Sequence, residues 1–332
     1  MKQPRLTWTS ELTSANYLTI IRKGRHLRML RKLLSSVLIA GCVSAGFVGA
    51  ALAAPPVQSC ADIHASDPSA LDGNYTIYPN GEQFTVYCAN MATSPADYLN
   101  LVNTGGSSNY TFNAGQSYNA DGNSTTHFTK VRIDPATLTV DVADYTFSTY
   151  MTTGSNPKFA GGPLTDYPYG TAAACLSPAD AAGTANIDLS GLPFKVASSF
   201  GHIGASAAGT ATFSLGGQIV NLTGGGYCGG EGAIETGGPY VPLVCCGGSD
   251  PYALQLAYIG PEASLDNLIA EFVSNADVAK AMEAQVHSIA TAPNAHAKAG
   301  KLGAFGNFLA AQTGKSISQE DASTVLRLAS AL

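Results

Sequence analysis

The sequence predicts a mainly β protein, with a disulfide-stapled, antiparallel, sandwich-like β domain followed by a small α-helical domain. Short alternating apolar runs separated by turn residues extend from residue 57 to about 250. Six cysteines lie in this region, and after Pro261 the pattern becomes helical and contains no cysteine. We therefore divide the chain into a leader at residues 1–53, a β domain at 54–250 and a helical bundle at 251–332.

The leader has the pattern of an export signal. A basic cluster at residues 28–32 precedes an uncharged apolar run at 33–50, and Ala51-Leu52-Ala53 offers a small-residue cleavage site. We expect a secreted, extracellular chain without stable membrane insertion after cleavage. The alternatives are a lipid anchor on Cys42, which ends the lipobox-like Ile39-Ala40-Gly41-Cys42, and a retained membrane anchor. Met29 is an alternative start of the leader.

Charge excludes some classes of partner for the exported part. Residues 1–53 hold eight of the 17 basic and one of the 23 acidic residues, which leaves nine basic and 22 acidic residues and a net charge of −13. Such a surface repels nucleic acid and anionic membranes and attracts cations.

The exported part keeps an even set of cysteines. They are Cys60, Cys88, Cys175, Cys228, Cys245 and Cys246. An even set in an exported chain predicts three disulfides, although spacing alone does not fix which cysteines pair. Since bonding between adjacent cysteines strains the ring, we expect Cys245 and Cys246 to bond to separate partners.

Two hairpins are predicted in the β domain. Alternating apolar residues flank Asn80-Gly81 between Tyr75 and Cys88, and Asn-Gly favours the positive φ angles of a type I′ turn. A second hairpin spans 130–145, with Pro135 at the second position of its turn. Further strands are expected at 185–189, 211–215 and 218–222.

The helical bundle is predicted from periodicity and caps. Apolar residues from Leu265 to Val273 recur on one helix face, and we expect Ser264 to cap this helix. Further helices are expected at 278–289, 302–311 and 318–332, the last opened by Ser318 and Asp321.

Several segments of the β domain form an ordered set of motifs. They are Ser59-Cys60-Ala61-Asp62, residues 72–77, Val86-Tyr87-Cys88, residues 128–134, Tyr169-Gly170-Thr171-Ala172, residues 185–189 and Gly225-Gly226-Tyr227-Cys228-Gly229. In this order they resemble the GON domain, a module of certain secreted metalloproteases. The resemblance implies that Cys60 pairs with Cys88, and that Cys175 pairs with Cys228, Cys245 or Cys246. The chain departs from the family pattern between residues 105 and 127, where a cluster of cysteines is expected and this sequence has none.

No catalytic, cofactor-binding or metal-ligating residue is identified. GON domains occur in the same chains as zinc proteases, yet the zinc-protease motif His-Glu-x-x-His is missing from this sequence. The serine-hydrolase motif Gly-x-Ser-x-Gly is missing as well. Asn119, Asp121 and Asn123 alternate as in a calcium loop but lack the downstream Glu, so we interpret them as a surface turn. We reject zinc binding by His202 with Cys228, Cys245 or Cys246 because an oxidising compartment favours disulfides.

Two surface features accompany these motifs. Many tyrosines could line a sugar or peptide surface, although most are expected to be half-buried strand residues. Asn74, Asn109, Asn123 and Asn221 begin glycosylation sequons, which matter only in a host that glycosylates secreted proteins.

These patterns favour a secreted, non-catalytic binding or adhesion module with an extracellular protein or glycan as ligand. A rigid stapled scaffold with polar loops and no catalytic set is typical of such modules. The alternatives are an ancillary part of a zinc metalloendopeptidase system and a structural surface protein that associates through its helical tail.

Overall fold

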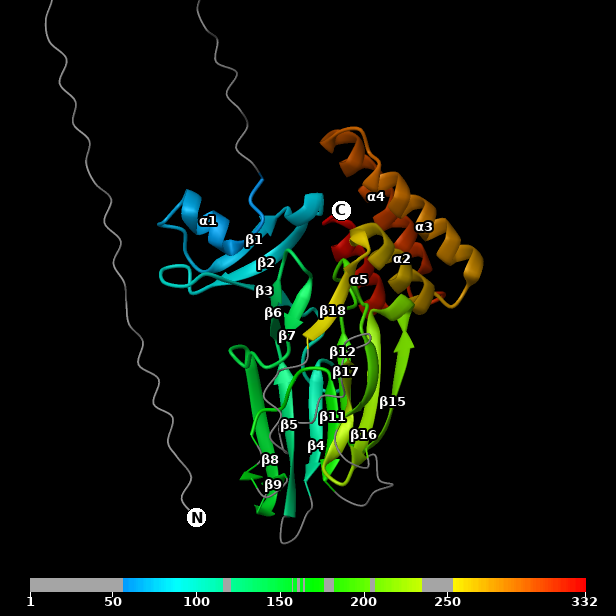
Figure 1. Cartoon of the computed structure of the whole chain (residues 1–332). Helices are drawn as coiled ribbons and strands as arrows, with labels where there is room; N and C mark the ends of the chain where they lie inside the picture. The colour runs from blue at the N-terminus through cyan, green and yellow to red at the C-terminus, as the bar shows by residue number, and fades with distance from the viewer. Residues whose placement is uncertain are drawn as a thin grey trace, which may run out of the picture. The chain divides into compact units, whose positions relative to one another are not determined.

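The computed structural model describes residues 56–115, 121–156, 158–159, 162–163, 165–175, 182–203, 207–234 and 253–332. Within them two mostly antiparallel sheets are followed by a group of four helices, as Figure 1 shows. The predicted fold class is therefore confirmed. In the described residues, no helix is both long and apolar enough to span a membrane.

The first sheet has seven strands. In spatial order they are β1 (Gly73–Ile77), β2 (Phe84–Ala89), β3 (Ala96–Asn100), β6 (Lys130–Asp134), β7 (Thr139–Asp141), β18 (Ala253–Tyr258) and β13 (Phe194–Val196). Strand β18 falls within the range assigned to the helical bundle, so this part of the prediction is wrong. The alternating Leu254 and Leu256 are buried, and their burial in the sheet decides the structure of this segment.

Both predicted hairpins are present. Strands β1 and β2 pair from Gly73–Cys88 to Ile77–Phe84, and β6 and β7 pair from Arg132–Asp141 to Asp134–Thr139. Between β1 and β2, Asn80 and Gly81 have φ angles of 54° and 85°, and the amide of Glu82 donates to the carbonyl of Pro79 (2.9 Å). The type I′ turn is therefore correct, although the ladder stops before it.

The second sheet is built around β4 (Tyr110–Gly115), which pairs on one side with β5 (Asp121–Phe128). Strand β5 also pairs with β8 (Ser148–Asn156). The other strands are β11 (Thr171–Cys175), β12 (Gly183–Asp188), β14 (Ser199–Ile203), β15 (Ala207–Ser214), β16 (Ile219–Gly226) and β17 (Gly229–Ile234). The strands expected at 185–189, 211–215 and 218–222 correspond to β12, β15 and β16. A separate small ribbon joins β9 (Lys158–Phe159) and β10 (Gly162–Pro163).

The second sheet divides into two arms at β4. Residues 110–112 pair with β12, and residues 113–115 pair with β11, in a parallel register. One arm continues through β16 and β15 and the other through β17 and β14. The arms contact each other, because β16 touches β11 and β17 while β15 touches β14 and β17.

Glycine allows this contact between the arms. A Cβ atom at Gly183 would overlap with the carbonyl of Ala173, and one at Gly224 or Gly230 would overlap with the carbonyl of Ala172. Gly183 and Gly224 meet the other arm, whereas Gly230 and Ala172 lie on β17 and β11, which pair within one arm. We call these five residues the glycine interface. Glycine is required where two backbones approach this closely.

A buried polar network joins the arms to β4. Asn109 is fully buried, and its Nδ2 donates to the carbonyls of Asn103 (2.7 Å) and Asp188 (2.9 Å). Its Oδ1 accepts from the amide of Asp188 (2.9 Å) and from the hydroxyl of Tyr169, and its amide donates to Asn186 Oδ1 (3.0 Å). The Asn109 sequon is therefore part of the core, and its side-chain amide is inaccessible to glycosylation in the folded state.

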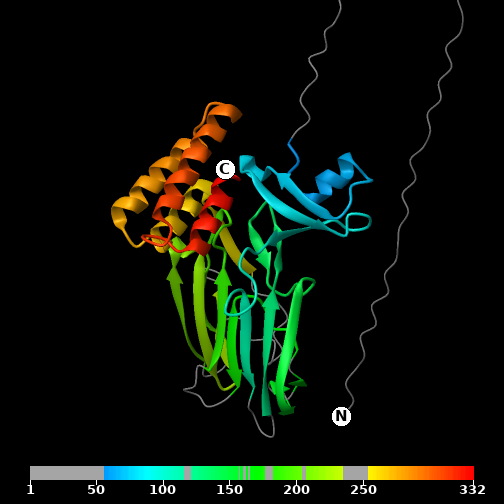
Figure 2. The same ribbon diagram turned by 180° about the vertical axis from the view of Figure 1, so that it is seen from behind.

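Both sheets share one hydrophobic core. Val86 and Leu254 from the first sheet and Ile187 and Val220 from the second are fully buried in the same cluster. Burial of this kind is the main source of folding free energy. Figure 2 shows the long strands of the second sheet from behind.

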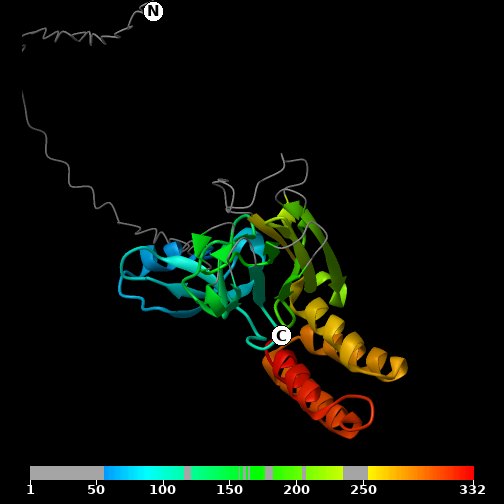
Figure 3. The ribbon, with the colours of Figure 1, turned by 90° about the horizontal axis from the view of Figure 1, so that it is seen from below.

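One helix lies inside the region for which the sequence predicted only strands. Helix α1 (Cys60–Ser66) is capped by Ser59, whose side chain accepts from the amide of Asp62 (3.2 Å). Seven residues give too short an apolar period to be recognised from sequence. Figure 3 shows that α1 stays with the first strands and is separate from the C-terminal helices.

The C-terminal helices are α2 (Gly260–Phe272), α3 (Ala276–Ala290), α4 (Ala295–Gln312) and α5 (Gln319–Ala329). Ser318 caps α5 as predicted. The expected cap at Ser264 is wrong, because α2 begins at Gly260 with Pro261 in its first turn. Ser264 is instead buried and accepts from Gln218 Nε2 of the β region (2.9 Å).

Replacing Gly224 with alanine tests the glycine interface. We expect Gly224→Ala to lose ~1–3 kcal/mol of unfolding free energy, because the methyl group would overlap with the backbone of Ala172 and Glu231. Urea unfolding followed by circular dichroism measures the change.

Gly303→Ala is the matched control, since Gly303 lies in α4 with open space around it. We expect this variant to gain ~0.5–1 kcal/mol from helix propensity. A Gly224→Ala protein as stable as the wild type would show that the arms do not meet in this way.

Candidate functional site

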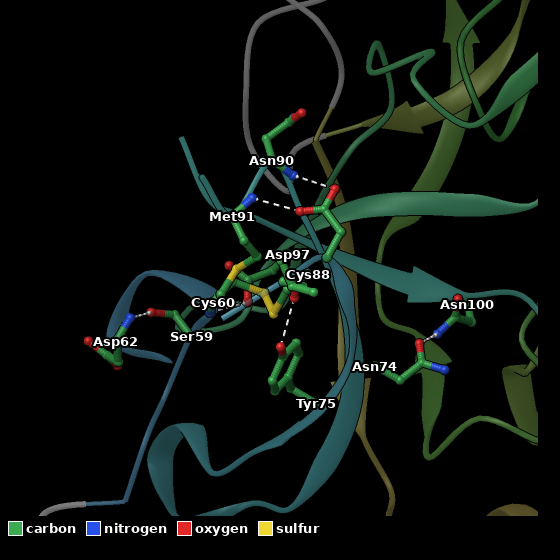
Figure 4. Close-up of a disulfide and its surroundings, with 12 residues drawn as sticks. Ser59, Cys60, Asp62, Asn74, Tyr75, Cys88, Asn90, Met91, Asp97 and Asn100 are labelled. Carbon is green, nitrogen blue, oxygen red and sulfur yellow. Dashed lines mark hydrogen bonds between the residues drawn. A yellow bond between two sulfur atoms is a disulfide. The ribbon is translucent and has the colours of Figure 1, made fainter. Parts of the chain in front are cut away.

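The disulfide between Cys60 and Cys88 anchors one end of the first sheet. It joins the start of α1 to β2, and both cysteines are fully buried. The pairing implied by the family resemblance is therefore confirmed. Figure 4 shows Asp97 beside this disulfide, on the strand that pairs Asp97 with Cys88.

Asp97 is a buried carboxylate with one satisfied oxygen. The residue is only 8 % exposed, and its Oδ1 accepts a hydrogen bond from the amide of Cys60 (2.8 Å). Burial raises the pKa of Asp97 to about 6, with smaller contributions from Asp134 and Asp62, while the Cys60 amide and Arg132 oppose the shift.

The sulfur atoms next to Asp97 do not complete a metal site. Cys60, Cys88 and Asp97 offer ligand atoms within 4.8 Å of one another. Metal coordination requires thiolates, however, and the two sulfurs are bonded to each other. As folded, this cluster fits no ion.

A cavity of about 680 Å³ opens next to Asp97. Its walls come from β3, β6, β7, the turn between β6 and β7, Ser59 and Ala253. We call it the groove. Among the described residues, the aspartates that line it are Asp97, Asp134 and Asp141, and the one basic residue is Arg132.

Strand alternation places the charged residues of the groove. On β6, Val131 and Ile133 are buried while Arg132 and Asp134 are exposed, and on β7 Val140 is buried while Asp141 is exposed. Hydrophobic burial on one face therefore directs these charges to the other face.

The exposed aspartates are fixed by their own turns. Asp134 Oδ1 accepts from the amide of Ala136 (2.9 Å), and Asp141 Oδ1 accepts from the amide of Ala143 (3.1 Å). Within the described residues, Oδ2 of Asp97, Asp134 and Asp141 accepts no hydrogen bond. Each carboxylate thus has one oxygen in a structural bond and one free to meet a ligand.

The two basic residues of β6 already have partners. Arg132 Nη1 lies 3.6 Å from Asp144 Oδ2, which also accepts from the hydroxyl of Tyr98 (3.0 Å). Lys130 Nζ lies 4.7 Å from the ring centre of Tyr87 and 4.6 Å from that of Phe147. Such contacts hold the cations in place. They leave the groove with an excess of negative charge.

The remaining predicted cysteines fall in two classes. Cys175, at the end of β11, bonds to Cys228, between β16 and β17, so one of the three open alternatives is selected. Cys245 and Cys246, like the leader with Cys42, lie outside the described residues.

His202 is paired with a carboxylate. Its Nε2 lies 3.7 Å from Oε2 of Glu231, a residue only 4 % exposed, and Cys228 is in its disulfide. Burial raises the pKa of Glu231, and His202 opposes the shift.

The other surface predictions have mixed outcomes. Asn119 lies outside the described residues, while Asp121 and Asn123 belong to β5, so the expected surface turn is wrong at these two residues. Tyr98 and Tyr169 are almost fully buried, whereas Tyr78, Tyr150 and Tyr227 are exposed.

Sequence reasoning missed the groove. The sequence reasoning included Arg132 and Asp134 only as members of a family motif, and it did not consider Asp97 or Asp141. The exposed face of the second hairpin was the available signal, because alternation from Lys130 to Asp134 puts its charges on one side. The contribution of Asp97 depends on a disulfide partner 37 residues away, which no local pattern reports.

A family model described as the GON domain matches residues 57–124 and 106–237. No curated protein and no solved structure shows a significant match to the chain.

Asp97→Asn tests the buried carboxylate, because the amide oxygen of asparagine can still accept from Cys60. The folded-state pKa of about 6 exceeds the ordinary 3.8, so the contribution of Asp97 to stability is fully present below pH 4 and is lost as the pH rises through 6. We expect the variant to be more stable than the wild type by ~1–3 kcal/mol at pH 7.5, with the difference shrinking below pH 4. Urea unfolding at pH 3.5, 5 and 7.5 measures it.

Glu271→Gln, at an exposed position of α2, serves as the control and should change stability by less than ~0.5 kcal/mol at each pH. A difference between Asp97→Asn and wild type that does not vary with pH would refute the shifted pKa.

Proposed function

Because the chain belongs to the GON domain family, we propose that it is an extracellular, non-catalytic binding module whose ligand is a protein or a glycan. The observation that carries the proposal is the groove, a preformed cavity on a stapled sheet with carboxylate oxygens free for a ligand.

The roles of the family residues support binding rather than chemistry. Cys60 and Cys88 form a buried bridge, Tyr169 and Asn186 bond to Asn109, and Gly230 follows the last motif at the glycine interface. These residues stabilise the fold. The exposed positions around them are then available for recognition.

The chemistry of the groove supports the same proposal. Within the described residues, Asp134 and Asp141 hydrogen-bond to backbone amides of their own turns, and no histidine or serine is bonded to them. General acid–base catalysis needs a positioned proton donor or acceptor next to the reacting group. This pair is arranged for contact with a ligand.

The disulfides support an extracellular setting. Cys60–Cys88 and Cys175–Cys228 lie in the same β region, and such bonds persist in oxidising compartments. Together with the signal-like leader, they fit a chain that works after export.

Binding is tested with residues 54–332, which form one compact unit. The immobilised protein is screened against a glycan array and against extracellular proteins, next to an Asp134→Asn/Asp141→Asn variant. We expect reproducible binding of one ligand class that weakens in the variant. A Glu271→Gln/Glu320→Gln variant, with the same change in charge at exposed helix positions, should bind like the wild type.

Casein and gelatin assays with and without chelator accompany the screen. We expect no cleavage in either condition. Cleavage that the chelator abolishes would overturn the proposal in favour of a metalloprotease activity.

A further inference from the structure

We propose that the groove binds a basic peptide segment of a partner protein, with lysine or arginine side chains meeting Asp97, Asp134 and Asp141. This inference rests on the proposed binding function and names the ligand class of the same site.

The charge of the groove selects a cationic ligand. Three carboxylates line it against Arg132, whose ion pair in the described part of the chain is with Asp144 and not with a groove aspartate. The exported chain has 22 acidic and nine basic residues, so its long-range field also draws basic partners. An acidic peptide or glycan would be repelled at both distances.

Asp97 indicates a ligand that donates hydrogen bonds. It is more than nine-tenths buried, it lines the cavity, and its Oδ2 has no hydrogen-bond partner among the described residues. Since Oδ2 is not one of the buried atoms left without a partner, it reaches the solvent of the groove, where a donor from a ligand can take the place of water. Ammonium and guanidinium groups supply several donors each.

The spacing of the carboxylates favours a peptide over a metal ion. In the described residues, the one set of three potential ligands within 4.8 Å of one another combines Asp97 with the two bonded sulfurs. Asp134 and Asp141 are in no such set, so one ion cannot contact all three aspartates. An extended peptide can meet spaced carboxylates in turn, because its side chains project at intervals along the chain.

The size of the cavity fits this ligand. A volume of about 680 Å³ lies in the range of sites that bury a small ligand or a few side chains. The groove therefore accommodates a short segment of a partner, with the rest of the partner outside it.

Fluorescence anisotropy with labelled hexalysine and hexaglutamate tests the proposal on residues 54–332 at near-physiological salt. We expect hexalysine to bind and hexaglutamate not to bind. Asp134→Asn/Asp141→Asn should weaken hexalysine about tenfold, the loss expected for two solvent-exposed charge pairs. Asparagine keeps an oxygen acceptor for each turn, so the variant should fold, which circular dichroism checks.

The pH dependence tests Asp97 itself. Ionisation of Asp97 between pH 5 and 7 should strengthen hexalysine binding in the wild type, and Asp97→Asn should lose most of this gain. The other charged groups near Asp97 are Asp62 on α1 and Asp134 and Arg132 on β6. The same gain with Asp97→Asn as with the wild type would therefore assign it to other groups and overturn the role of Asp97.

The control separates the groove from general charge. Glu271→Gln/Glu320→Gln makes the same change in net charge and should bind hexalysine within twofold of the wild type. An equal loss in both double variants, or displacement of hexalysine by millimolar calcium at constant ionic strength, would overturn the proposal.

The two proposals fail in different ways. If the screen finds a ligand that binds the groove variant as well as the wild type, the binding function stands and the groove proposal falls. If no ligand of any class binds, both proposals fall.

Discussion

The fold depends on close backbone contact between strands of the second sheet, which only glycine permits at the contact positions. One arm of the second sheet pairs with the first half of β4, and the other arm pairs with its second half. The two arms meet again at the glycine interface. A side chain at Gly183 or Gly224 would hold the arms apart, and one at Gly230 would disturb the pairing of β17 with β11 inside one arm. Since the shared core lies between this sheet and the first, separation of the arms would also disturb the residues that both sheets bury together.

The glycine interface needs a partner that fixes register, and the buried polar network provides it. Asn109 joins β4 to Asp188 at the end of β12 and to Tyr169, which precedes β11. These bonds are demanding, because a polar group buried without a partner costs more than a satisfied one contributes. The network therefore admits one arrangement of the arms, and weak hydrophobic contacts between alanine and glycine can then suffice.

The first sheet meets different demands. Its inner face contributes to the common core, while its outer face carries charges and rings that the core does not need. The disulfide joins α1 to β2, next to a carboxylate of β3 whose second oxygen is open to the groove. Rigidity and an accessible carboxylate oxygen thus coincide at the groove, a combination expected at sites that recognise ligands.

Local patterns in the sequence determined much of this structure. Alternation gave the hairpins, three-residue and four-residue spacing gave the C-terminal helices, and Asn80-Gly81 and Ser318 marked a turn and a cap, because each of these depends on neighbouring residues alone. Tertiary structure decided the rest. Helix α1 is too short to show a helical period in the sequence. Strand β18 forms because it pairs with strands more than 50 residues away. Ser264 accepts a hydrogen bond from Gln218 and does not cap a helix. The groove and the glycine interface arise where distant segments meet, and the free energy of such a meeting depends on pairs of residues that no single stretch of sequence contains.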